Sequence, residues 1–142
     1  MDERVVSVRE GRRSLTAWVR RLGDDVVVAV GGGDRLHVGC AVLATPVRAR
    51  DGRLRSPSCS VVTVPPHKEE AIARPVAERI AGELGRLALV TAGVHDDDLD
   101  ADGIATYLAL AERLAEAVVE TLRDTRSRDS LSEPDRRSDP QR

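Results

Sequence analysis

Residues 58–84 read SCSVVTVPPHKEEAIARPVAERIAGEL, and the spacing of apolar side chains changes within this stretch. The first part, 58–64, is rich in β-branched residues and predicts a strand. From Lys68 onward the apolar residues recur every four positions, as on one face of a helix, and they are Ile72, Val76, Ile80 and Leu84. Pro75 lies inside this stripe and predicts a kink or a break, whereas Gly85 predicts the end of the helix. The stretch therefore predicts a strand that passes directly into a helix.

The rest of the chain supplies further elements. Strands are predicted at 13–21, 26–30, 37–45 and 87–94, and a second helix at 101–123. The order of four strands, a helix, a strand and a helix indicates an α+β fold with a mixed, mostly antiparallel five-stranded sheet and two main helices. We expect the first four strands to form a meander, and a right-handed parallel crossover to lead to the fifth.

Length and composition favour one domain. The chain has 142 residues, of which 41% are hydrophobic. We expect the domain to span 13–123, between an N-terminal segment at 1–12 and a tail at 124–142. In the tail only Leu131 is strongly apolar, so the tail is predicted to be disordered.

Composition also excludes some classes of function. The net charge is −2, and Trp18 and Tyr107 are the only aromatic residues, which argues against binding nucleic acid or stacking on bases. No apolar run is long enough to span a membrane, and the first residues lack the pattern of a secretory signal, so we expect a cytoplasmic protein. Cys40 and Cys59 lie inside predicted strands and are interpreted as buried small hydrophobic residues.

The predicted topology gathers polar residues from separate parts of the chain at one edge of the sheet. In a meander these residues are Gly31, Gly32, Gly33, His37, His67 and His95. Both predicted helices begin at the same edge, which adds free backbone N–H groups and the positive ends of two helix dipoles. We therefore expect a site there for an anion, a metal or a ligand that carries phosphate.

Each of these features also has a purely structural interpretation. Three glycines followed by Asp34 are typical of a hairpin turn and lack the spacing of a nucleotide-binding loop. A single histidine at a strand end is usually structural, and Glu69 and Glu70 complement the dipole of a helix start. The convergence of these features is what favours a site.

Two chemistries suit the cluster. A divalent metal prefers imidazole and carboxylate ligands, and the candidates are His37, His67 and His95 with Asp97 or Glu69. Alternatively, Lys68, the only lysine of the chain, and His67 bind a phosphate at the helix start. A hydrolase is poorly supported, because the chain has no Gly-x-Ser-x-Gly motif and both cysteines lie within strands.

Three separate phrases resemble one protein family. They are GGDRLHVG at 32–39, PHKE at 66–69 followed by ARPVAE at 73–78, and AGVH at 92–95. In this order, and over about 13–123, the chain is similar to the prenylated flavin chaperone LpdD-like family, which includes the small D subunit associated with gallate decarboxylase. The resemblance implies a fold related to proteasome-assembly chaperones.

The resemblance also implies a function. It suggests a non-catalytic chaperone or maturation factor that binds prenylated FMN and supports a UbiD-type decarboxylase. Because the chain has too few aromatic residues to stack on the flavin, we expect a homodimer that completes the pocket or direct transfer to the decarboxylase. The positions that match the family's motifs, and are implied to bind the cofactor, are Gly32, Gly33, His37, His67, Lys68, Glu69, Arg74, His95 and Asp97. A metal-dependent enzyme that uses the three histidines and a purely protein-binding assembly chaperone are the alternatives.

Overall fold

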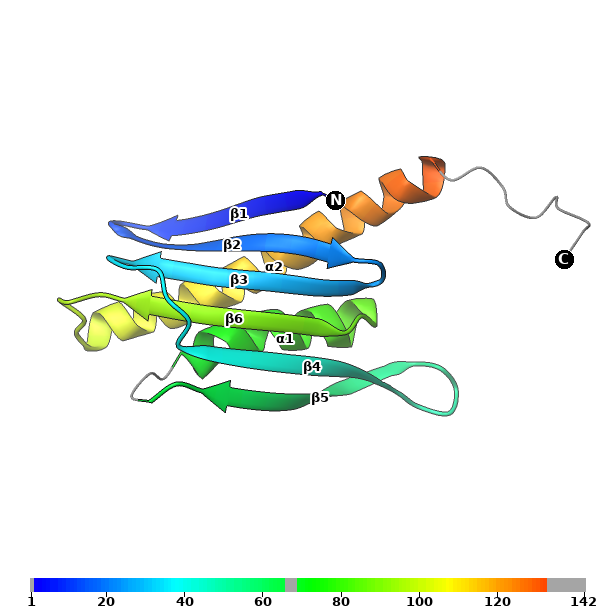
Figure 1. Ribbon diagram of the computed structural model, residues 1–142, viewed down its shortest axis with the longest axis horizontal. Helices are drawn as coiled ribbons and strands as arrows, with labels where there is room; N and C mark the ends of the chain where they lie inside the picture. The colour runs from blue at the N-terminus through cyan, green and yellow to red at the C-terminus, as the bar shows by residue number, and fades with distance from the viewer. Residues whose placement is uncertain (1, 66–68, 133–142) are drawn as a thin grey trace, which may run out of the picture.

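The computed structural model describes residues 2–65 and 69–132. It contains six strands and two helices, shown in Figure 1. In chain order they are β1 (Glu3–Glu10), β2 (Arg13–Leu22), β3 (Asp25–Gly33), β4 (Cys40–Arg48), β5 (Leu54–Thr63), α1 (Glu70–Leu84), β6 (Ala88–His95) and α2 (Ala101–Ser132). The predicted α+β class, with a mixed sheet and two main helices, is confirmed.

The predicted number of five strands is wrong, because β1 adds a sixth. This strand pairs antiparallel with β2 and lies in the segment 1–12, for which no strand was predicted. Its apolar residues are only Val5, Val6 and Val8, with charged residues on both sides, and Val5 is 60% exposed because it faces away from the core. An edge strand of this kind gives a weak hydrophobic signal.

The predicted meander is also wrong. The strand order is β1-β2-β3-β6-β4-β5, so the last strand lies between β3 and β4 (Figure 1). β6 pairs in parallel with β3 and antiparallel with β4. β5 and β6 run in the same direction on either side of β4, and α1 supplies the crossover connection that passes over β4 between them. As a result, the connection from β3 to β4 must cross the end of β6.

Both helices pack on the same face of the sheet, and the hydrophobic core lies between these two layers (Figure 1). α1 contacts β4, β5 and β6, whereas α2 contacts β1 and β2. The fully buried side chains are aliphatic and include Leu15, Val28, Val90, Ile80 and Leu114. Each such valine, leucine or isoleucine side chain contributes about 1.5–3 kcal/mol by its removal from water. The core therefore needs almost no aromatic residues.

The two cysteines have the character expected from the sequence. Cys40 is fully buried in the core and Cys59 is half-buried, and neither forms a disulfide. Burial raises the pKa of both thiols, and the nearby Glu78 adds to the increase at Cys59. Because a protonated thiol is a poor nucleophile, neither is suited to covalent catalysis.

Helix α1 continues through Pro75, so the predicted break is not present. The guanidinium of Arg74 bonds to Glu70 in the preceding turn and to Glu78 in the following one, with 3.2 Å between its Nη1 and Glu78 Oε1. These contacts join the two turns on either side of the proline. The predicted end is confirmed, because Gly85 has a positive φ of 65° and donates its N–H to the carbonyl of Ala81.

Helix α2 is longer than predicted. It ends at Ser132 instead of 123, so the first part of the predicted tail is helical, and residues 133–142 lie outside the described part of the chain. Between Gly103 and Pro134 the sequence contains no glycine or proline to stop a helix. None of the helices in the described ranges is long and apolar enough to cross a membrane.

Candidate functional site

The ends of the strands bring two of the three histidines to one edge of the sheet. His95 ends β6 and pairs with Gly33 at the end of β3, and His37 lies just before β4. We call this region the histidine edge, defined as residues 33–38, Glu69 and residues 95–97. His67 and Lys68, which were predicted to lie at the same edge, fall outside the described residues.

The connection between β3 and β4, residues 34–39, is the crossing loop, and glycines allow its close approach to β6. A Cβ at Gly93 would lie 1.8 Å from the carbonyl oxygen of His37, and a Cβ at Gly33 would lie 2.0 Å from that of His95. Two backbone hydrogen bonds hold the loop, from Asp34 N–H to His95 O at 2.5 Å and from Gly39 N–H to Ala92 O at 2.8 Å. The glycines at 31–33, interpreted as a turn, instead complete β3.

A buried carboxylate orients the first histidine. Glu69 precedes α1, its side chain is 8% exposed, and its Oε1 lies 3.1 Å from His37 Nε2. Because an ionised carboxylate only accepts hydrogen bonds, Nε2 carries the proton and donates. The backbone N–H of Val94 also donates to Oε1, at 3.4 Å. Gly39 leaves the space that the carboxylate fills, since a Cβ there would lie 2.3 Å from Glu69 Oε2.

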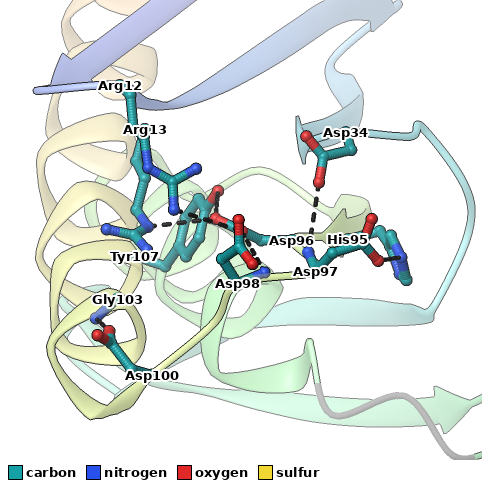
Figure 2. Close-up of polar contacts among 10 residues, drawn as sticks. All are labelled: Arg12, Arg13, Asp34, His95, Asp96, Asp97, Asp98, Asp100, Gly103 and Tyr107. Carbon is teal, nitrogen blue, oxygen red and sulfur yellow. Dashed lines mark hydrogen bonds and ion pairs between the residues drawn. The ribbon is translucent and has the colours of Figure 1, made fainter.

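The second histidine lies in a more exposed polar group. His95 Nε2 is 2.7 Å from Asp97 Oδ1 and 3.3 Å from a guanidinium nitrogen of Arg35. The backbone N–H of Asp97 donates to Asp34 at 3.3 Å (Figure 2). Arg35 and Asp34 belong to the crossing loop, so these contacts connect the loop to the end of β6.

Asp96 lies between His95 and Asp97 in the sequence, but its side chain points away from Asp34 and toward Tyr107 of α2. Its side chain is 3% exposed, and its Oδ2 accepts hydrogen bonds from Arg13 Nε at 3.2 Å and from the Tyr107 hydroxyl at 3.1 Å. Arg12 lies 3.8 Å from its other oxygen, and the N–H of Asp98 donates to that oxygen at 3.2 Å. Figure 2 shows Asp96 directed toward Tyr107, whereas Asp97 lies on the side of Asp34. Asp96 therefore joins β2, α2 and the end of β6.

The surroundings of Asp96 determine its protonation. Burial raises the pKa of this carboxyl, but the hydrogen bonds from Tyr107, Asp98 N–H and Arg13 outweigh burial, and the net pKa lies below the ordinary value. Burial, followed by the hydrogen bond to Asp96, raises the pKa of Tyr107. At neutral pH the pair is therefore a carboxylate that accepts from a neutral phenol.

A pocket of about 440 Å³ opens at the histidine edge. The residues that line it are Arg35, Leu36, His37, Val38 and His95. Its volume lies in the range that small-molecule sites occupy. It combines the N–H groups of an arginine and two histidines with two exposed apolar side chains, so it suits a ligand that has both an anionic and an apolar part.

The structure places the predicted site residues in different surroundings. His37, Glu69, His95, Asp97 and Gly33 meet at the histidine edge. Gly32 instead faces β2, where a Cβ would lie 2.6 Å from Ser14 O, and Arg74 pairs with Glu70 and Glu78 along α1. Within residues 2–65 and 69–132, no three His, Cys, Asp or Glu side chains are arranged to hold a metal ion.

Sequence analysis missed Asp96 and Arg35. Asp96 was given no role of its own, although it lies between the predicted site residues His95 and Asp97. Strand alternation from His95 was the signal that could have separated it from Asp97, because successive residues of a strand point to opposite faces. For Arg35, its place between Asp34 and His37 in one of the quoted motifs was the available signal.

Comparison with known families decides the relationship. A family model for the prenylated flavin chaperone LpdD-like domain matches residues 9–123. The chain belongs to this family. The LpdD-like match includes every residue of the histidine edge. It starts at residue 9, four residues before the stretch 13–123 that was recognised from the sequence.

A known structure is similar in fold to this LpdD-like domain. A chain from a crystal structure of a chaperone complex for yeast 20S proteasome assembly is similar, with a TM-score of 0.54 and 16% sequence identity. The match covers 85% of this chain and 98% of that one, which confirms the expected likeness to proteasome-assembly chaperones in fold. Among curated proteins, none matches the LpdD-like sequence.

Proposed function

We propose that this LpdD-like domain binds prenylated FMN at the histidine edge and passes it to a UbiD-type decarboxylase, without catalysing a reaction itself. The observation that carries the proposal is the pocket lined by Arg35, His37 and His95 in a chain of the prenylated flavin chaperone family. The description of that family supplies the class of ligand. The donors of the pocket supply a chemical reason for binding it.

The residues of the pocket suit the parts of the flavin. Its phosphate is an anion and accepts hydrogen bonds from N–H donors, which the guanidinium of Arg35 and the imidazole of His37 provide. Glu69 Oε1, which lies 3.1 Å from His37 Nε2, holds the imidazole ring in place. Leu36 and Val38 are 66% and 58% exposed and offer apolar surface to the ring system. Lys68 remains a predicted phosphate contact at the start of α1.

The lack of aromatic residues at the pocket favours release of the flavin. No phenylalanine exists in the chain, and no aromatic residue lines the pocket in the described part of the structure, so strong stacking on the isoalloxazine is not supplied there. A carrier that transfers its ligand to an enzyme needs moderate affinity.

Titration tests the proposal. The purified full-length chain is titrated with prenylated FMN, FMN and riboflavin, with binding measured by flavin absorbance and calorimetry. We expect prenylated FMN to bind, FMN to bind more weakly, and riboflavin, which lacks the phosphate, to bind at least about tenfold more weakly than FMN. His37→Ala and Lys68→Ala should weaken binding of prenylated FMN. Arg79→Ala, which removes an arginine paired with Glu83 on α1, serves as the control.

Transfer is tested separately. An apo UbiD-type decarboxylase is mixed with the loaded chain, and the recovery of decarboxylase activity is compared with that after addition of free prenylated FMN. Faster or more complete activation by the loaded chain supports the proposal. The proposal is contradicted if the chain binds neither reduced nor oxidised prenylated FMN.

A further inference from the structure

Helix α2 carries an apolar seam that is buried along most of its length and exposed at its start. Its residues recur at alternating spacings of four and three, as on one side of a helix that packs against another surface. In order they are Ile104, Leu108, Ala111, Ala115, Val118 and Leu122. The last four are at most 2% exposed, whereas Ile104 is 49% exposed and Leu108 is 42% exposed. The first two turns of the seam therefore have the composition of a packed surface and lie at the surface of the domain.

Neighbouring alanines enlarge this apolar surface. Ala101, Ala105 and Ala109 are exposed and lie one helical turn apart, next to Ile104 and Leu108. We call these five residues the helix patch. Residues 103–111 include no charged side chain, although charged residues make up 32% of the chain. Single exposed aliphatic residues are common, but a group at helical spacing without charge marks an interaction site.

Acidic residues border the helix patch where α2 begins. Asp97, Asp98, Asp100 and Asp102 are all exposed. Their neighbour Asp96 is instead buried and faces Arg12 and Arg13. No lysine or arginine occurs between residues 96 and 112, so these four carboxylates form an acidic rim.

The rim connects the helix patch to the pocket. Asp97 belongs to the rim and also to the histidine edge, because its Oδ1 lies 2.7 Å from Nε2 of His95, which lines the pocket. Figure 2 shows Asp97 and His95 in the same turn that leads to Asp100 and Gly103 at the start of α2. A protein that binds the helix patch therefore lies close to the pocket.

We propose that the helix patch docks the decarboxylase that receives the flavin, and this choice of partner rests on the proposed function. An enzyme that accepts a flavin phosphate needs cationic side chains to hold it, so the mouth of its empty flavin site carries positive charge. The acidic rim is complementary to such a mouth and repels the other charge sign. The partner surface accordingly consists of apolar side chains with lysine and arginine around them.

Charge and length exclude two other occupants of the helix patch. A second copy of the chain would bring one acidic rim against another, which is unfavourable. The chain's own residues 133–142 contain no aliphatic residue. They follow the far end of α2, about 36 Å along the helix from Leu108, and ten residues reach that distance only when fully extended.

The size of the helix patch suits a partner that binds and leaves. Residues 101–109 span about 12 Å along the helix. Interfaces of small area are typical of transient complexes, whereas permanent ones are larger. A protein that delivers its ligand has to dissociate afterwards, so a small docking surface is consistent with transfer.

Binding of an apo UbiD-type decarboxylase to the full-length chain, with no flavin present, tests the docking surface. We expect calorimetry to detect a complex, and Ile104→Arg to raise its dissociation constant at least about 20-fold, because the new cation faces a cationic partner. Leu22→Arg is the matched control, since Leu22 is 50% exposed and lies at the opposite end of the sheet, and it should change the constant less than about twofold. Urea denaturation verifies that each variant is folded, and Ala105→Arg replaces Ile104→Arg if the latter is not.

Two further measurements examine the acidic rim and the transfer. Asp98→Lys combined with Asp102→Lys should slow association with the apo decarboxylase at least about threefold at low salt, and the difference should shrink at high salt. Ile104→Arg loaded with prenylated FMN should hold it as tightly as the wild type does, because Ile104 does not line the pocket. The same loaded variant should activate the apo decarboxylase at least about tenfold more slowly.

The docking surface and the flavin site can fail separately. If the wild type forms no complex at up to about 100 µM apo decarboxylase, or if Ile104→Arg binds it as tightly as the wild type, the docking proposal is overturned even when the chain binds prenylated FMN. If Ile104→Arg abolishes the complex and Leu22→Arg does not, the docking surface is supported. This holds even for a chain that binds no flavin, and in that case only the proposed function is lost.

Discussion

The crossing loop and the turn at Asp96 both place a histidine at the same edge of the sheet, but different forces hold them. His37 is held by close backbone packing, because Gly93 leaves no side chain between its own strand and the loop. His95 is held by charge, since the buried Asp96 next to it binds Arg13 and Tyr107. The position of His37 therefore depends on the lack of a side chain at Gly93, and the position of His95 depends on the ionised carboxylate of Asp96.

This difference has consequences for the response to mutation and to pH. Steric packing is insensitive to pH but does not tolerate even one added methyl group. A buried ion cluster tolerates changes of size better but weakens when its carboxylate is protonated. The following predictions separate the two.

Gly93→Ala should have the largest effect. Its Cβ would lie 1.8 Å from the carbonyl oxygen of His37, which is backbone and cannot move without displacing the crossing loop. We expect a loss of at least about 3 kcal/mol in the free energy of unfolding, measured by urea denaturation, together with loss of flavin binding.

Gly82→Ala is the matched control for this substitution. Its Cβ would meet only the ring of Pro57, at 3.5 and 3.9 Å, and it lies inside α1. We expect no loss, or a gain of up to about 1 kcal/mol from helix propensity. Equal stabilities for the two variants would show that the crossing loop does not lie against Gly93.

Asp96→Asn should have the next largest effect. The substitution keeps the shape of the side chain but removes the charge that Arg13 and Arg12 face, and hydrogen bonds to a charged group contribute about 1.5–3 kcal/mol. We expect a loss of about 2 kcal/mol in the free energy of unfolding at pH 7. Asp97→Asn, at a side chain that is 75% exposed, should change it by less than about 0.5 kcal/mol. Similar losses in both variants would contradict the assignment of the anchor to Asp96.

The difference between wild type and Asp96→Asn should also depend on pH. The pKa of Asp96 is below its ordinary value in the folded state, so its stabilising contribution is complete above about pH 4, the ordinary value for aspartate. As the pH falls through the lower folded pKa, the contribution is lost. Urea denaturation between pH 7 and pH 2 should therefore show the two stabilities converging only below about pH 4. Convergence at a higher pH would show that another group is responsible.

The sequence predicted the histidine edge although it predicted the wrong strand order. The edge depends only on strand direction: β3 and β6 end there, and β4 starts there. Successive strand predictions were sufficient to establish direction, so His37 and His95 were correctly placed together. The position of β6 depends on pairing between distant strands, which no local pattern encodes.

The misses have local causes as well. The apolar residues of β1 are few and lie between charged pairs, and the adjacent Val5 and Val6 face opposite sides of the sheet, so they do not give a clear alternating pattern. The three glycines at the end of β3 were interpreted as a turn, because glycine is typical of turns, and the close approach of Gly33 to the carbonyl of His95 becomes visible only with β6 in place. Pro75 was expected to interrupt α1, but the pairing of Arg74 with both adjacent turns was not considered.

Arg35→Ala gives the smallest expected effect on stability and the sharpest comparison of the two regions. Arg35 belongs to the crossing loop, and its guanidinium lies 3.3 Å from His95 Nε2, so it connects the two regions at the surface together with Asp34. Exposed contacts of this kind contribute little, and we expect a change of less than about 0.5 kcal/mol in the free energy of unfolding. Because Arg35 lines the pocket, the dissociation constant for prenylated FMN should nevertheless rise at least about tenfold.

Arg35→Lys should recover only part of this loss of affinity, since an ammonium group lacks the planar donors that bind phosphate in a bidentate manner. Unchanged affinity in Arg35→Ala, measured by calorimetry beside the Arg79→Ala control, would show that Arg35 does not bind the phosphate.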